Sequence, residues 1–384
     1  MKNKPTKLNK TYLSILGWMI TACVSNNAFA RPEYEAQLSK MCETAKRVPP
    51  KFNADVCSTC HDTNDWKKMT PQKKSFLGAE IDKFCPTVNV SEKVDYQLYD
   101  AKAPALEKGN VHDIVLTAVE KKAVIAPNVT QELWTFDGKV PGPVIRVKLG
   151  DKVRVRFVNP STNKLPHSVD FHASQVAWND EMASIDPGEE KMYEWTADYA
   201  GVWMYHCGSN PALHHIASGM YGMVIVEPKG GLPKVDHEFA LVQSEFYTNN
   251  DNTHGANMPH AMNSKPDYVA FNGVAFQYKD HPIKVETGKK VRMFVLNAGP
   301  NEDSAFHIVG TIFNRVIKEG VELTPNNKGG YGSQAVDLAP AQGAIIEFTT
   351  KEDGLYPIVT HAFNFVGRGA LGLVQSDDGD PTNK

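Results

Sequence analysis

The segment from Tyr205 to Gly222, YHCGSNPALHHIASGMYG, gathers one cysteine, three histidines and one methionine into eighteen residues. Cys207, His215 and Met220, joined by His167 from an earlier strand, would supply one thiolate, two imidazoles and a weak thioether. A copper ion that carries one electron requires this set, because it serves Cu(I) and Cu(II) with little rearrangement. We therefore expect these four side chains to hold one metal, with His214 beside the site as a bystander.

A second group of histidines should face away from the first. In HSVDFH, His167 and His172 are five positions apart, so the pleat of an extended segment points them to opposite faces. The neighbours His206 and Cys207 divide in the same way. We expect His172 and His206 to form a second site with His361. Three histidines and an open fourth position suit a catalytic metal. Zinc would serve hydrolysis there, but copper is favoured because the adjacent His206 and Cys207 couple the two metals by a short covalent path that only redox chemistry uses.

The elements that must position these side chains are short β-strands. Apolar runs separated by turn residues predict strands at sandwich-like intervals, at 153–158, 222–228, 290–296 and 344–350. An internal repeat aligns 136–172 with 271–310 and 201–207 with 354–362. His361 then falls opposite His206, whereas Ala362 and Ala370 fall opposite Cys207 and Met220. The fold class is therefore mainly β, with two tandem β-sandwiches preceded by a small helical, cysteine-rich unit.

The composition and the first thirty residues indicate the class of partner and the cellular location to expect. The 384 residues carry a formal net charge of -3 and no basic block, which argues against a nucleic-acid partner. Residues 1–30 combine four lysines, an apolar run and a terminal AFA, typical of an export signal cleaved before Arg31. We expect a periplasmic protein. As an alternative, Ile20–Cys23 resembles a lipobox, which would make Cys23 a lipidated N-terminus.

Residues 31–95 contain four further cysteines, with a linker expected to reach about residue 109. The run CSTCH at 57–61 matches the c-type haem attachment motif, in which Cys57 and Cys60 form thioether bonds and His61 is the proximal iron ligand. Met69 is the candidate distal ligand. Cys42 and Cys85 would then pair as a disulfide in a unit too small to rely on its core. Two disulfides with an incidental His61, or a zinc site made of all four cysteines, are the alternatives.

Over about residues 110–375 the chain resembles the copper-containing nitrite reductases. The resemblance lies in LPHSVDFH, MYHCGSNPALHHIASGMYGMVIVEP, FHIVGTIF and the lone His361. It implies cupredoxin domains at 110–232 and 233–376, a tail at 377–384, and a homotrimer. It also implies type 1 copper at His167, Cys207, His215 and Met220, type 2 copper at His172, His206 and the neighbouring subunit's His361, and proton handling by Asp170 and His307.

The implied activity is the one-electron reduction of nitrite to nitric oxide and water at type 2 copper, fed by type 1 copper. The electron would come from an external donor such as a cytochrome c or a cupredoxin, or from the haem-like unit through a polar tether at 94–111. A laccase-like multicopper oxidase needs His-x-His pairs and a His-Cys-His run, but this chain has no His-x-His and Gly208 follows Cys207. A non-enzymatic copper electron-transfer protein would explain only the first site.

Overall fold

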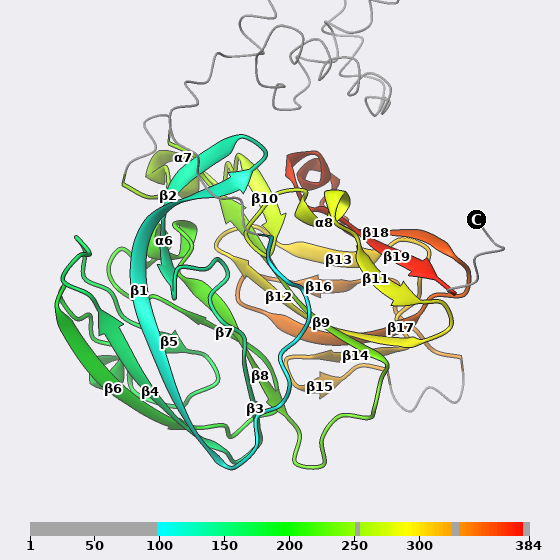
Figure 1. Ribbon diagram of the computed structural model, residues 1–384, viewed down its shortest axis with the longest axis horizontal. Coiled ribbons are helices and arrows are strands. Elements are labelled where there is room, and N and C mark those ends of the chain that lie inside the picture. Colours follow the sequence, from blue (N-terminus) through cyan, green and yellow to red (C-terminus); the bar gives the residue numbers. More distant parts are fainter. Residues whose placement is uncertain (1–97, 250–253, 325–329, 379–384) are drawn as a thin grey trace, which may run out of the picture. The chain divides into compact units, whose positions relative to one another are not determined.

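The computed structural model describes residues 98–249, 254–324 and 330–378, and the strands of this part of the chain form four β-sheets (Figure 1). The expected mainly β fold is confirmed. Several sequence predictions lie outside the described residues, namely the export signal, Cys23, Cys42, Cys57, Cys60, His61, Met69 and Cys85.

The first sandwich is built from two four-stranded sheets, ordered β2-β1-β4-β6 and β3-β8-β7-β5. Its core lies between them and includes Phe157, Tyr193 and Trp195, all nearly inaccessible to solvent. The strands are β1 (Val111–Ala126), β2 (Val129–Phe136), β3 (Ile145–Lys148), β4 (Lys152–Asn159), β5 (Asp170–Phe171), β6 (Glu189–Thr196), β7 (Gly201–His206) and β8 (Tyr221–Glu227).

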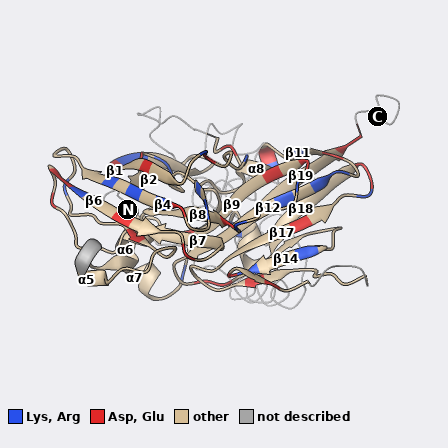
Figure 2. Ribbon diagram, turned by 90° about the horizontal axis from the view of Figure 1, so that it is seen from below, with Lys and Arg blue, Asp and Glu red and all other residues tan. Residues whose placement is uncertain are grey.

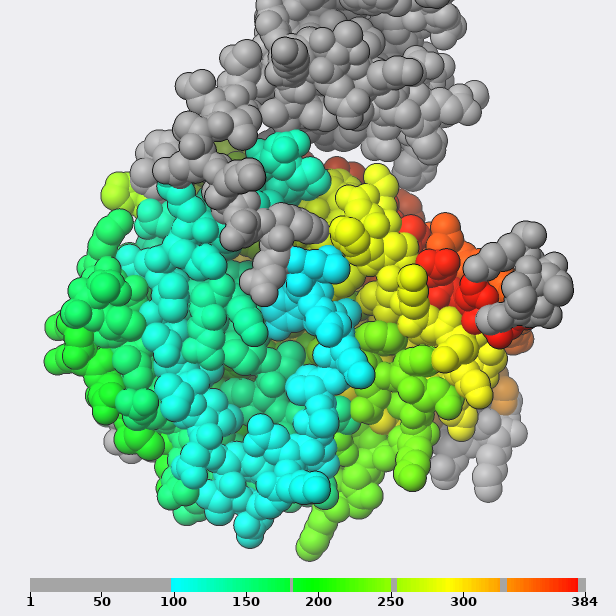
Figure 3. All heavy atoms as spheres, in the orientation of Figure 1, coloured from blue at the N-terminus to red at the C-terminus, as the bar shows by residue number. Residues whose placement is uncertain are grey.

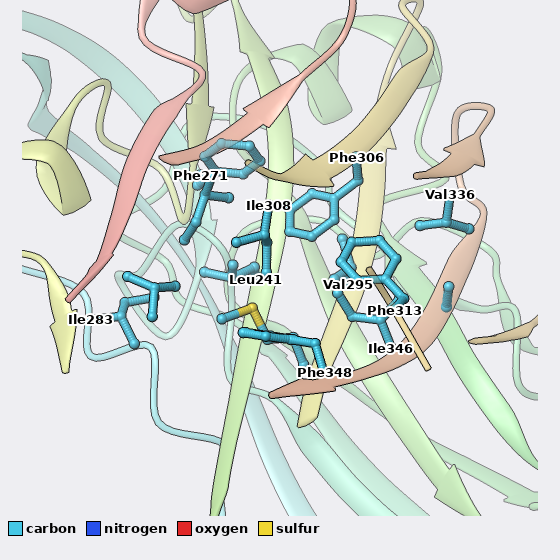
Figure 4. Close-up of a cluster of buried hydrophobic side chains, with 14 of the residues drawn as sticks. Leu241, Phe271, Ile283, Val295, Phe306, Ile308, Phe313, Val336, Ile346 and Phe348 are labelled. Carbon is cyan, nitrogen blue, oxygen red and sulfur yellow. The ribbon is translucent and has the colours of Figure 1, made fainter. Parts of the chain in front are cut away.

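The second sandwich pairs a six-stranded sheet, ordered β10-β9-β12-β17-β14-β15, with a five-stranded sheet, ordered β11-β19-β18-β13-β16. Phe271, Phe306 and Phe348 pack in the core between the two sheets (Figure 4). The strands are β9 (His237–Phe246), β10 (Tyr268–Phe271), β11 (Ile283–Glu286), β12 (Lys290–Gly299), β13 (Ser304–Ile308), β14 (Arg315–Lys318), β15 (Val321–Glu322), β16 (Val336–Leu338), β17 (Gly343–Thr349), β18 (Gly354–Thr360) and β19 (Leu371–Asp377).

The two sandwiches repeat one topology. Strand β4 pairs parallel with β1 and antiparallel with β6, just as β12 pairs parallel with β9 and antiparallel with β17. Strand β7 lies between β5 and β8, and β18 lies between β13 and β19. The strand pairing therefore follows the internal repeat seen in the sequence.

A third apolar layer joins the two sandwiches. Met204 and Met223 from β7 and β8 pack with Val242, Phe294 and Ile345 from the second sandwich. The inner sheet of one sandwich thus lies against the inner sheet of the other, and residues on β7 have core contacts on one face and contacts with the second sandwich on the other.

An N-terminal strap, residues 98–110, runs along the surface where the two sandwiches meet (cyan in Figures 1 and 3). Tyr99 accepts a hydrogen bond from the Tyr278 hydroxyl of the second sandwich at 2.9 Å, and Arg146 of the first sandwich donates to Pro104 O at 2.8 Å. Ala101 and Ala103 are buried. The sequence suggested a polar tether here, but residues 99–104 are bonded to both sandwiches, because their small apolar side chains and free backbone groups find partners there.

Helices are short and lie in the connections. They are α5 (Trp178–Glu181), α6 (Ala212–Ala217), α7 (Met258–Met262), α8 (Gln277–Asp280) and the 3-10 helix η2 (Phe363–Arg368). Among the described residues, none of these helices has the length and apolar character needed to cross a membrane.

Candidate metal centres

The first group of predicted ligands comes from the loops at one end of the first sandwich. Strand β7 ends at His206, so Cys207 opens the following loop, and α6 in that loop carries His215. Met220 immediately precedes β8, and the amide of Cys207 donates to Met220 O at 3.1 Å. His167 arrives from the segment before β5. The hydrogen bond between Cys207 and Met220 joins the two ends of the loop, so these residues, thirteen positions apart in the sequence, lie close together.

The ligand atoms of three of these residues converge. His215 Nδ1 lies 3.2 Å from His167 Nδ1 and 3.3 Å from Cys207 Sγ. All three side chains are buried, and Met220 is fully buried in the same core cluster as Cys207. A buried thiol facing two imidazole nitrogens fits a thiophilic metal such as copper, and these residues are the ones that would hold it.

Glu120 orients His167. The His167 Nε2–H donates to Glu120 Oε1 at 3.3 Å, and the same oxygen accepts the amides of Lys164 and Leu165. With Nε2 as donor, Nδ1 keeps its lone pair on the side of Cys207. A carboxylate behind a ligating histidine fixes the tautomer and the ring orientation in many metal sites.

Burial also sets the protonation of this group. Burial, with His167 and His214 nearby, lowers the pKa of His215 to about 3. Burial lowers the pKa of His167 as well, although Glu120 acts in the opposite sense. The imidazoles are therefore neutral and available as ligands at neutral pH. Burial raises the pKa of the Cys207 thiol, against hydrogen bonds from Ser168 and Ser209, so metal binding has to displace its proton.

The second group lies at the edge strand β5, on the opposite side of the backbone. His172 Nε2 and His206 Nε2 lie 3.0 Å apart, and Asp170 Oδ2 lies 3.8 Å from His206 Nε2. His206 Nδ1–H donates to Cys207 O at 2.9 Å, which leaves Nε2 facing His172. Loss of water around the ring and the neighbouring His206 lower the pKa of His172, while Asp170 opposes the shift. Two imidazoles and one carboxyl group thus form an accessible cluster that could hold a metal ion.

His361 and His307 lie together on the second sandwich, and the structure does not bring them to the His172–His206 pair. The two rings are 5.2 Å apart, and the His361 amide donates to the carbonyl oxygen of Ala305 in β13. His307 Nδ1–H donates to Gln334 O, so its Nε2 is free of that bond. Within the described residues, the group of close ligand atoms at β5 comprises Asp170, His172 and His206 without His361. The predicted set of three histidines is thus divided into two places within one chain.

Three residues near the first group were missed from the sequence. Glu120 lies 47 positions from His167 and Ser168 lies 39 positions from Cys207, and neither has a motif of its own. The ring of Trp134 lies 4.8 Å from that of His215 and 4.5 Å from that of His214. His214 itself lies at the rim, as expected, where its Nε2–H donates to His254 O.

Comparison with known proteins identifies relatives over the two sandwiches. A family model described as multicopper oxidase matches residues 117–231. A copper-containing nitrite reductase of Neisseria meningitidis serogroup B is 40% identical over 272 residues, which cover 68% of each chain. A solved copper nitrite reductase from Nitrosomonas europaea is 37% identical, with a TM-score of 0.64 over 71% of this chain and 96% of that one. A crystal structure of a multicopper oxidase is 28% identical, with a TM-score of 0.62 over 72% of this chain and 94% of that one.

Proposed function

This chain belongs to the copper-containing nitrite reductases, and from that membership we propose that it reduces nitrite by one electron to nitric oxide and water. The observation that carries the proposal is the adjacency of His206 and Cys207. These neighbours place a buried thiol among the nitrogens of His167 and His215, and an imidazole beside His172. A one-electron donor site and a substrate site are then separated by one peptide unit.

The residues divide the work between the two sites. His167, Cys207, His215 and Met220 would hold the type 1 copper, and His172, His206 and His361 the type 2 copper. Copper in these two sites supplies one-electron transfer and a position that binds the nitrite anion. The hydrogen bond from His206 Nδ1 to Cys207 O adds a second link between the ligand sets.

Asp170 and His307 would move the protons. Conversion of nitrite consumes one electron and two protons and releases nitric oxide and water, so a group that can be recharged near neutral pH must stand beside the departing oxygen. Asp170 is partly exposed and lies next to His206. His307 Nδ1–H donates to Gln334 O, and its Nε2 has no hydrogen-bond partner among the described residues.

A homotrimer would complete the second site, with His361 and His307 contributed by the neighbouring subunit. Both histidines lie on the second sandwich, away from Asp170 and His172 in the same chain. Phe363, whose ring is 5.0 Å from that of His361, and Ile312 are large apolar side chains exposed on this sandwich. Large exposed apolar side chains on one face favour burial against another copy.

The periplasm is the proposed location, with lipid anchoring at Cys23 as the alternative, and covalent haem at Cys57 and Cys60 is the proposed internal donor. His61 would be the proximal ligand and Met69 the distal one; an external cytochrome c or cupredoxin would feed the haem or the type 1 copper. Haem staining of a denaturing gel, after expression with a cytochrome c maturation system, should be positive. An unstained band would leave Cys57 and Cys60 as disulfide partners.

A multicopper oxidase is the second candidate, because that family model matches residues 117–231. Four-electron reduction of oxygen needs a cluster of several coppers, and the chain contains no His-x-His pair to build one. Oxygen consumption with an aromatic reductant separates the two activities.

The decisive test of the proposed function is nitrite-dependent nitric oxide formation by the copper-loaded protein with an artificial one-electron donor. About two coppers per chain should accompany turnover, one of each type. Copper-replete protein that consumes no nitrite would refute the proposal.

A further inference from the structure

A turn of the second sandwich, residues 254–256, reaches across to the loop that carries His215 and Met220. His214 Nε2–H donates to His254 O at 2.9 Å, and the Ala256 amide donates to Ser218 Oγ at 2.9 Å. The turn precedes α7, which packs on α6 and lies beside it (Figure 2). One sandwich thus carries the ligands and the other covers the segment that holds them.

Ser218 connects the two sandwiches at this contact. It caps the C-terminus of α6, three residues after His215 and two before Met220, and it is fully buried. Its carbonyl accepts the amide of Trp134 from β2 at 3.0 Å, while its hydroxyl accepts Ala256 from the second sandwich. The backbone between the two predicted ligands is therefore held from both sandwiches at once.

Trp134 fills the space between this junction and the ligand ring. Its side chain is 2% exposed, its ring stands 4.8 Å from that of His215, and its Nε1 has no hydrogen-bond partner among the described residues. A buried indole that makes no polar contact acts through its shape. It restricts rotation of His215 and excludes water from that side of the ligand.

Gly255 shows how closely the turn fits. Its φ is +71°, and a Cβ there would lie 3.0 Å from Trp134 Cζ2 and would clash with Ser218 Oγ. Gly288, in the same sandwich, has a φ of +79° but open space around its missing Cβ. Both glycines adopt a left-handed backbone conformation, but only at Gly255 would an added Cβ meet neighbouring atoms.

We propose that residues 254–256 of the second sandwich, acting through Ser218 and Trp134, form a clamp that positions His215 and Met220 and so sets the properties of the type 1 copper. Ser218, Trp134 and Gly255 are positioning residues, because none of them supplies a predicted ligand. This inference rests on the proposed copper at the first site.

The experiment compares Gly255→Ala with the matched control Gly288→Ala in the full chain. In the copper-loaded protein, Gly255→Ala should shift the type 1 absorption band and lose that copper to a chelator about 10-fold faster or more, the usual effect of disturbing the support of a ligand. Gly288→Ala should match the wild type in both measurements. The type 2 EPR signal should be unchanged in both variants, which separates a local change from general unfolding.

Ser218→Ala supplies the second variant, because it removes the acceptor for Ala256 without adding bulk. It should shift the band in the same way even where Gly255→Ala fails to fold. Ser218→Ala and Gly255→Ala proteins that both keep the wild-type band and release rate would overturn the clamp, and so would equal effects of Gly255→Ala and Gly288→Ala.

Hydrogen exchange of the copper-free protein tests the clamp without the metal. The backbone amides of α6 should exchange faster in Ser218→Ala than in the wild type. In Gly288→Ala the same amides should exchange at the wild-type rate. A wild type with no type 1 band would refute the proposed copper centre, whereas unchanged exchange in Ser218→Ala would refute the clamp itself.

Discussion

The two groups of predicted ligands differ in burial and in completeness. His167, Cys207 and His215 are 0, 0 and 4% exposed and meet within one chain, whereas Asp170, His172 and His206 form an accessible group from which His361 is absent. A site that only transfers electrons needs rigid surroundings that exclude water, and it needs no opening for substrate. A site that turns over an anion needs an open position, and the second group is accessible to solvent in this chain.

The second copy of the repeat strengthens the contrast. Ala362 and Ala370 occupy the places of Cys207 and Met220, and Ala370 is fully buried in the second core. The positions that match the first group are thus filled by alanines in the second sandwich, while His361 is exposed. The two sandwiches thus share a β framework and differ in the residues of these loops.

The largest effect is expected from Cys207→Ala. Removal of the thiolate should abolish the charge-transfer absorption and reduce turnover to background, because Cys207 is the one free thiol among the described residues. The type 2 EPR signal should persist, since His172 and His206 are untouched. Loss of both signals together would contradict the separation of the two sites.

At the exposed site, Asp170→Asn and His307→Ala should each keep both coppers and lose turnover by about 100-fold or more, the usual contribution of a general acid-base group. The pH profile of turnover should flatten in both. Asp113→Asn is the matched control, because Asp113 is an exposed carboxylate paired with Arg154. Wild-type rates for Asp170→Asn would remove this residue from the proton path.

At the buried site, Glu120→Gln should weaken the binding of type 1 copper. A neutral amide is a weaker acceptor for His167 Nε2–H, so the affinity for type 1 copper should fall by about 10-fold. Glu190→Gln, which changes an exposed partner of Arg156, should have no effect. Competition with a chelator, followed at the type 1 absorption band, measures the copper affinity of both variants. An affinity of Glu120→Gln equal to that of the wild type would show that Glu120 only accepts the amides of Lys164 and Leu165.

A smaller effect concerns the stability of the copper-free protein in acid. The pKa of His215 is lowered from 6.5 to about 3, so between these values the unfolded state binds a proton that the folded state does not. Stability should therefore fall as the pH falls from 6.5 toward 3, and His215→Phe should lessen that fall by a few degrees of Tm. His281→Phe, at an exposed histidine, is the control. Parallel curves for wild type and His215→Phe would contradict the burial of this imidazole.

Much of the framework was predictable because strand patterns are local. The run 153–158 lies within β4, whose alternating apolar residues fill the first core. The run 290–296 lies within β12, which is buried on both faces. The opposite directions of His167 and His172 followed from the pleat, and the structure brings one to Cys207 and the other to His206.

What the sequence did not reveal depends on contacts between distant segments. Glu120, Trp134 and the 254–256 turn support the first site from other strands and from the other sandwich, and no local pattern marks a residue for such a role. The segment 94–111 appeared polar by composition, but backbone groups of residues 99–104 find partners on both sandwiches. Packing of this kind becomes visible only when the chain has folded.

Subunit complementation tests the division of the second site most directly. His172→Ala and His361→Ala chains should each be inactive as pure oligomers, because each lacks one ligand at every site. After unfolding and joint refolding, mixed oligomers should regain part of the nitrite turnover and of the type 2 EPR signal, since some interfaces then combine an intact His172 with an intact His361. Mixed oligomers that remain inactive, with subunit exchange shown by a size or affinity tag, would contradict a site shared between chains.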